Sequence, residues 1–217
     1  MNRVALIPML LALACVGCLH SPKNYPGGGG DNINPSDYAA KTCPNLSGSY
    51  ETLGELLDGD ATARRLSKSM RIEYVFPFSN EEDLRRIRAA ARTENGRIQT
   101  PVTAQVELVR LRVLKLNLIY PGGNVANNEF SFENVNRFVC TGENGKIIWG
   151  GASEGGRSEF GPNSTDSVVM LYLDGQGNLI SEESTQVHMS LRLGAIPVGT
   201  AKYFAIYRFK RLPESMK

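Results

Sequence analysis

Several stretches of the chain alternate between apolar and polar residues with a period of two, which is the pattern of β-strands that bury one face. In residues 186–193 (QVHMSLRL) every odd position is apolar and every even position is polar. Residues 167–173 are more continuously apolar and run into a turn-like sequence at 174–178 (DGQGN). We therefore predict two strands that form a hairpin around this turn.

A second hairpin is predicted over residues 137–149, with its turn at 143–145 (ENG). Residues 201–212 are rich in Tyr and Phe and predict a final strand. Residues 102–120 also alternate, but the apolar phase shifts at 110–112, which indicates a bulge or two strands. A helix over this stretch is the alternative.

One stretch has the pattern of a surface helix, which begins at a capping box of Ser79 and Glu82 and ends before 95–96 (NG). Its first turn is acidic and its later turns are basic, as the helix dipole favours. The basic residues are Arg85, Arg86, Arg88 and Arg92, and the narrow apolar stripe consists of Leu84, Ile87 and Ala91. We expect the helix to lie on the outside of a sheet, with its arginines in solvent rather than in an anionic-ligand site.

Antiparallel hairpins with one helix predict a mainly β fold. We expect a single antiparallel sheet or a barrel-like (calycin-like) domain with one surface helix, because closure protects strand edges; a small sandwich is the alternative. The predicted domain covers residues 43–213, with 214–217 as a C-terminal tail. The chain is 41% hydrophobic and 21% charged, which is ordinary for a globular protein.

Residues 4–16 form an uncharged, mostly apolar run that follows Arg3 and is interrupted only by Pro8. A membrane span needs roughly 20 apolar residues, whereas a signal peptide has an apolar region of about 7–15. We therefore predict a signal peptide over residues 1–17.

This run ends in small residues before a cysteine, and it resembles the lipobox of bacterial lipoproteins, in which that cysteine is acylated with chains such as palmitate. Cleavage before Cys18 leaves an even pair of cysteines, whereas cleavage before Cys15 strands a third thiol, so we favour Cys18 over Cys15. Leu19 rather than Asp follows, and this implies by resemblance the outer membrane. An inner-membrane anchor, a surface location and an ordinary secretory signal are the alternatives.

Residues 18–42 are rich in Gly, Pro, Asn and Ser, including 26–30 (PGGGG), and predict a lipidated flexible tether. The domain itself carries little excess charge, since the whole chain has a formal net charge of +2. A nucleic-acid partner is therefore disfavoured.

The remaining cysteines, Cys43 and Cys140, predict a disulfide in an oxidising compartment, with two buried free thiols as the alternative. Three motifs, Cys43-Pro44-Asn45-Leu46-Ser47-Gly48-Ser49-Tyr50, Phe138-Val139-Cys140-Thr141-Gly142 and Tyr207-Arg208-Phe209, together resemble a group of uncharacterised proteobacterial lipoproteins. That resemblance implies no activity. The Leu-x-Gly-x-Tyr piece is separately similar to the first strand of avidin-like and lipocalin-like barrels.

Catalytic chemistry has few candidates in this sequence. The histidines are His20, in the tether, and His188, on the polar face of a strand, so any Ser-His or Cys-His pair must use His188. The sequence contains neither cysteines and histidines at the spacing of a zinc site nor a G-x-S-x-G nucleophile elbow. Residues 174–178 fail the calcium-loop template, and Glu154, Glu159 and Asp166 beside a Gly-rich loop are interpreted as solvated. We expect no enzyme activity, cofactor or metal.

The sequence thus favours a membrane-anchored lipoprotein with a non-enzymatic, envelope-associated binding role, whose partner is unspecified. One alternative is a barrel that holds a small apolar ligand, with an interior lined by Tyr172, Met189, Phe204 and Tyr207. A second is an inhibitor of a periplasmic or cell-wall enzyme, presenting residues 149–156 as an exposed loop with Trp149 as its anchor.

Overall fold

The computed structural model describes residues 35–59, 70–77, 81–93, 95–134, 137–158, 161–191 and 196–213. The predicted signal peptide, Cys15, Cys18, Ser79, Glu159 and the tail at 214–217 lie outside the described residues.

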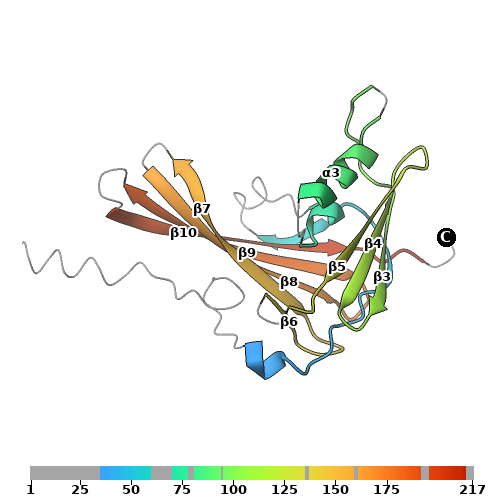
Figure 1. The fold of residues 1–217 in the computed structure, drawn as a ribbon, viewed down its shortest axis with the longest axis horizontal. Helices are drawn as coiled ribbons and strands as arrows, with labels where there is room; N and C mark the ends of the chain where they lie inside the picture. The colour runs from blue at the N-terminus through green and yellow to red at the C-terminus, as the bar shows by residue number, and fades with distance from the viewer. Residues whose placement is uncertain are drawn as a thin grey trace, which may run out of the picture.

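Two antiparallel sheets make up the domain (Figure 1). The four-stranded sheet has the order β1 (Gly48–Tyr50), β3 (Thr103–Arg110), β4 (Val113–Ile119), β5 (Val125–Ser131). The six-stranded sheet has the order β2 (Glu55–Gly59), β10 (Ile196–Phe209), β9 (Leu179–Leu191), β8 (Gly161–Leu173), β7 (Ile147–Ser158), β6 (Phe138–Cys140). The helical elements are α3 (Glu81–Ala90) and the 3₁₀ helices η2 (Pro35–Tyr38) and η3 (Ile72–Tyr74). The prediction of a mainly β fold with one surface helix is therefore confirmed.

Each predicted hairpin is present. β8 and β9 pair around the turn at 174–178, and β6 pairs with β7. The phase shift at residues 110–112 marks the turn between two paired strands, β3 and β4, so the helix alternative is wrong. Among the described helices, none is long and apolar enough to cross a bilayer.

The two sheets are joined along one side. After β10, the chain hydrogen-bonds to β1: Glu51 N donates to Lys210 O at 2.9 Å, and Leu212 N donates to Ser49 O at 2.7 Å. Residues 50 and 211 form an isolated antiparallel bridge there. On the other side, β5 and β6 are the end strands of their sheets. The sheets are not closed into a barrel, and the fold is a curled sandwich with a seam between β5 and β6.

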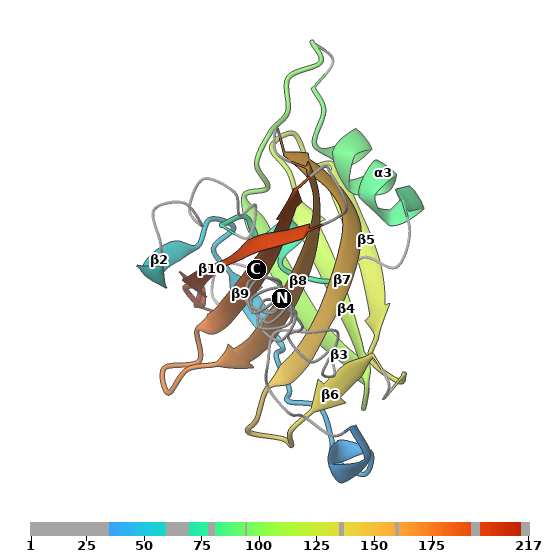
Figure 2. The same ribbon diagram turned by 90° about the vertical axis from the view of Figure 1, so that its left-hand side faces the viewer.

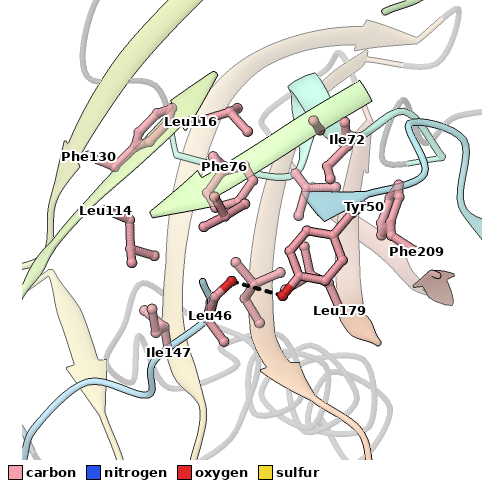
Figure 3. Packing of buried hydrophobic residues seen from close by; sticks show 14 of the residues in the cluster. Leu46, Tyr50, Ile72, Phe76, Leu114, Leu116, Phe130, Ile147, Leu179 and Phe209 are labelled. Carbon is pink, nitrogen blue, oxygen red and sulfur yellow. Dashed lines mark hydrogen bonds between the residues drawn. The ribbon is translucent and has the colours of Figure 1, made fainter. Parts of the chain in front are cut away.

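A single large core fills the space between the sheets (Figure 3). Tyr50 is fully buried there and donates its hydroxyl hydrogen bond to Leu46 O at 2.8 Å. The alternation along each strand explains this core, because residues of one parity face inward. The largest fully buried side chains include Tyr50, Tyr120, Tyr207, Phe132, Phe209, Leu114, Leu116 and Leu118.

A small second cluster lies on the outer face of the six-stranded sheet, where Val139, Ile148 and Val168 are buried. Tyr38 of η2 and Met170 pack against it. The predicted tether, residues 18–42, therefore packs against the sheet at Tyr38.

α3 lies beside β5 on the outside of the domain (Figure 2). Its buried side chains include Ile87 and Asp83, and Ala91 just beyond it is buried as well, whereas Arg85 and Arg88 are exposed. The helix thus has the narrow buried stripe and the solvated arginines that its pattern predicts.

Candidate functional site

The segment predicted as an exposed anchor loop is part of a strand. Residues 149–156 belong to β7 and pair with β8. Trp149 is only 8% exposed, and its ring lies 6.3 Å from Phe132 and 6.4 Å from Phe138. Trp149 is therefore part of the core, and the prediction of an inhibitory loop at this position is wrong. Pairing with β8 forms the backbone hydrogen bonds that hold this glycine-rich segment of β7 in a strand.

Two of the three carboxylates considered for acid/base work, Glu154 and Asp166, are strand residues, and Glu159 lies outside the described residues. Glu154 pairs with Ser164, and Asp166 pairs with Ala152, so both lie in the β7–β8 ladder rather than beside a Gly-rich loop. No group of three or more potential metal ligands occurs among the residues that the structure describes.

His188 lies on β9 with its Nδ1 atom 3.1 Å from Thr200 Oγ1 on β10. Cys140 forms a disulfide with Cys43, as predicted, and so has no thiol for a Cys-His pair. Nucleophilic chemistry through this pair is therefore not available.

The turn at 174–178 is explained by turn chemistry. Asp174 Oδ1 accepts from the backbone N–H groups of Gln176 and Asn178, at 2.9 Å each. Desolvation raises the pKa of Asp174, but the hydrogen bonds from Asn178 and Gln176 outweigh it and leave the pKa below its ordinary value. This aspartate stabilises the β8–β9 turn.

The four residues predicted to line a ligand cavity do not converge. Tyr172 on β8 pairs with Ile180 on β9, and Ile180 pairs with Arg208 on β10. The residue next to Arg208 is Tyr207, which is buried on the core face. Strand alternation therefore puts Tyr172 and Phe204 on the outer face, and Met189 and Tyr207 on the inner one. The proposed lining is wrong, because successive side chains of these strands point to opposite faces.

A buried ionisable group that the sequence did not reveal lies on η3. Glu73 is 1% exposed and forms an ion pair with Arg71. Burial raises the pKa of Glu73, and burial together with the nearby charge of Glu73 raises the pKa of Tyr120 to about 12. The group is closed off from solvent, which favours a structural role over contact with a ligand.

The seam between β5 and β6 contains a cleft of about 290 Å³, which we name the seam cleft. β5, β6 and the segments beside them contribute its lining, which consists of Pro77, Glu129, Phe130, Ser131, Asn134, Arg137 and Phe138. Its polar side chains come from exposed positions, whereas its two phenylalanines are buried.

The floor of the seam cleft is aromatic. Phe130 stacks on Phe76 with ring centroids 5.3 Å apart, and Phe138 meets Phe132 edge to face at 5.1 Å. Arg137 holds its guanidinium 5.3 Å from the centre of the Phe138 ring. A rigid apolar floor beside a guanidinium suits an apolar side chain with a neighbouring carboxylate.

A second cleft, of about 270 Å³, lies on β1, β3 and β4 beside the C-terminal segment. Ser49, Gln105, Asn117 and Arg211 are among its lining residues, and its lining includes no aromatic side chain. Aromatic side chains are enriched at the centres of protein interfaces, so the seam cleft is the stronger candidate for contact with a protein.

Comparison with protein-family models, with curated protein sequences and with solved structures found no match.

Proposed function

We propose that this protein is an envelope lipoprotein, anchored through acyl chains on Cys18, whose β domain binds a protein partner without catalysis. The disulfide between Cys43 and Cys140 carries the proposal. Disulfides persist in oxidising compartments such as the bacterial periplasm, so the bridge supports export of the chain. The same bridge uses both remaining cysteines, which leaves Cys15 and Cys18 for processing. We place the anchor in the outer membrane, with the domain in the periplasm.

Serine replacements of the two candidate cysteines test the anchor. We expect Cys18→Ser to move the protein from the membrane pellet to the soluble fraction, because stable membrane attachment depends on its acyl chains. Cys15→Ser is the matched control, and we expect it to leave the protein in the pellet. Intact mass of the extracted protein measures the acyl chains directly. Unchanged pelleting of the Cys15→Ser, Cys18→Ser double variant would refute the anchor.

The seam cleft is the proposed contact with the partner. Its volume of about 290 Å³ is at the lower end of the roughly 300–1,000 Å³ typical of ligand pockets and has room for one inserted side chain. We propose a partner segment that places an apolar side chain over Phe138 and a carboxylate against Arg137. This chemistry favours a protein partner over an apolar small ligand.

A photocrosslinking residue at Ser131, introduced in cells of the native host, tests this contact. We expect a discrete adduct, and we expect Arg137→Glu to reduce its yield at least tenfold, in line with the roughly 2 kcal/mol of a hot-spot residue. The same residue at Asn127, exposed on the same strand but outside the cleft, is the control and should give no adduct. Equal adducts at both positions, or no effect of Arg137→Glu, would contradict the proposal.

A further inference from the structure

α3 carries a row of arginines on one side. Arg85 and Arg88 are three residues apart on α3 and so lie next to one another along the helix, and Arg92 follows two residues after the helix ends. All three are exposed. Arg86 differs from them because it pairs with Asp83. Three guanidinium groups are thus presented together to solvent.

The turn after α3 adds a fourth cation and an apolar side chain. This turn closes on itself, because Thr93 N donates to Arg97 O at 2.9 Å and residues 92 and 98 form an isolated antiparallel bridge. Arg97 and Ile98 are exposed at this turn, and Ile98 is 67% exposed. The arginine surface, defined as Arg85, Arg88, Arg92 and Arg97, therefore borders a large exposed apolar residue.

Further exposed apolar residues lie at the same end of the molecule, each between 42% and 58% exposed. They are Leu53, Met70, Val102 and Val125. Hydrogen bonds tie their segments together: Arg71 donates to Gln99 O at 3.4 Å, Thr52 Oγ1 to Pro101 O at 2.7 Å, and Val102 N to Ile119 O at 2.7 Å. Residue 53 bridges residue 71, and Ile119 pairs with Val125.

In the part of the helix and its following turn that the structure describes, the acidic residues lie at the start of α3; Glu94, between Arg92 and Arg97 in the sequence, is outside that part. Glu82 is exposed in the first turn, and Asp83 is occupied by Arg86. Among the described residues from Arg85 to Ile98, every charged side chain is an arginine. The helix is therefore polarised, with its cations beside the apolar residues.

We infer that this end of the domain docks on an anionic phospholipid bilayer, through the arginine surface and with Ile98 and its apolar neighbours at the lipid boundary. Anionic headgroups attract arginines near a membrane surface, and apolar side chains that surround them enter the interfacial region. A nucleic acid would use the arginines but would leave the apolar residues in water. The combination favours lipid.

Both views show α3 and the turn that follows it at one end of the domain, with η2 at the opposite end (Figures 1 and 2). The residues that follow the proposed anchor enter the fold at η2, so the arginine surface faces away from the point where the chain enters.

Vesicle sedimentation of the full chain tests the inference. The probes are vesicles of phosphatidylcholine alone and of phosphatidylcholine mixed with phosphatidylglycerol. We expect tighter binding to the mixed vesicles, and we expect Arg85→Glu, Arg88→Glu, Arg92→Glu to remove this preference. Each arginine near an anionic surface contributes about fivefold, so three contribute roughly a hundredfold.

Lys41→Glu, Arg110→Glu, Lys202→Glu is the matched control, because it makes the same change in net charge at three exposed positions elsewhere. It should retain the preference for anionic vesicles. An acyl chain or signal segment contributes equally to both triple variants, so the difference between them does not depend on the proposed anchor. Ile98→Ser should weaken binding to the mixed vesicles. Equal loss in the two triple variants, or no preference in the wild type, overturns the inference.

Discussion

Replacing both bridging cysteines, as Cys43→Ala with Cys140→Ala, is expected to lower the free energy of unfolding by about 4–5 kcal/mol. The two half-cystines are 97 positions apart, and a loop of roughly 100 residues gives about 4.7 kcal/mol in the chain-entropy model. Domains are typically stable by only about 5–15 kcal/mol, so this loss leaves a marginal fold. Urea denaturation monitored by circular dichroism measures the change.

The bridge also positions the start of the domain. Cys43 and Cys140 are both buried, and Cys140 lies on β6, the end strand beside the seam. Arg112 holds the preceding segment through Ala39 O at 3.1 Å. Reductant should destabilise the wild type by a similar amount and leave the double variant unchanged. A free energy of unfolding that changes by less than about 1 kcal/mol in both experiments would contradict a main stabilising role.

Strands with an uninterrupted local pattern were predictable from the sequence. β9 alternates strictly, and the turn before it carries an aspartate whose side chain bonds two backbone amides. Both signals act within a few residues, so no knowledge of distant contacts is needed. The disulfide was predictable from cysteine parity for the same reason, since the choice of partners was small.

β5 and the part of β7 after residue 149 were missed because their local signals point elsewhere. β5 alternates between buried and exposed positions, but one of its buried positions is Asn128, which hides the apolar pattern. β7 contains a run rich in glycine, which reads as a loop, and its pairing with β8 overrides this preference. Long-range hydrogen bonding decides both strands.

The seam cleft was not predictable for a related reason. Pro77, Phe130 and Phe138 come from three segments, and they meet only because β5 and β6 end their respective sheets. The sequence shows these aromatic residues, but it does not show that they lie next to one another in the fold. By contrast, the arginines of α3 were evident as a helical face, since their spacing alone brings them together.

Phe132→Ala is expected to destabilise the domain by about 3–5 kcal/mol, the cost typical of removing a buried phenylalanine. Phe132 is fully buried, and its ring contacts Phe138 edge to face at 5.1 Å and lies 6.3 Å from Trp149. The resulting cavity would open directly beneath the floor of the seam cleft. Phe132→Leu, which keeps most of the volume, should cost clearly less.

Trp149 provides the readout, because it is the only tryptophan in the chain and belongs to the same aromatic cluster. Its fluorescence should change in folded Phe132→Ala and stay close to wild type in Val125→Ala, where the replaced side chain is exposed and the cost should be within about 0.5 kcal/mol. Adduct formation at Ser131 should fall in Phe132→Ala even under conditions where the variant is folded, because Phe138 loses the ring that fixes its position. A stable Phe132→Ala variant with wild-type fluorescence would show that the cluster does not support the cleft.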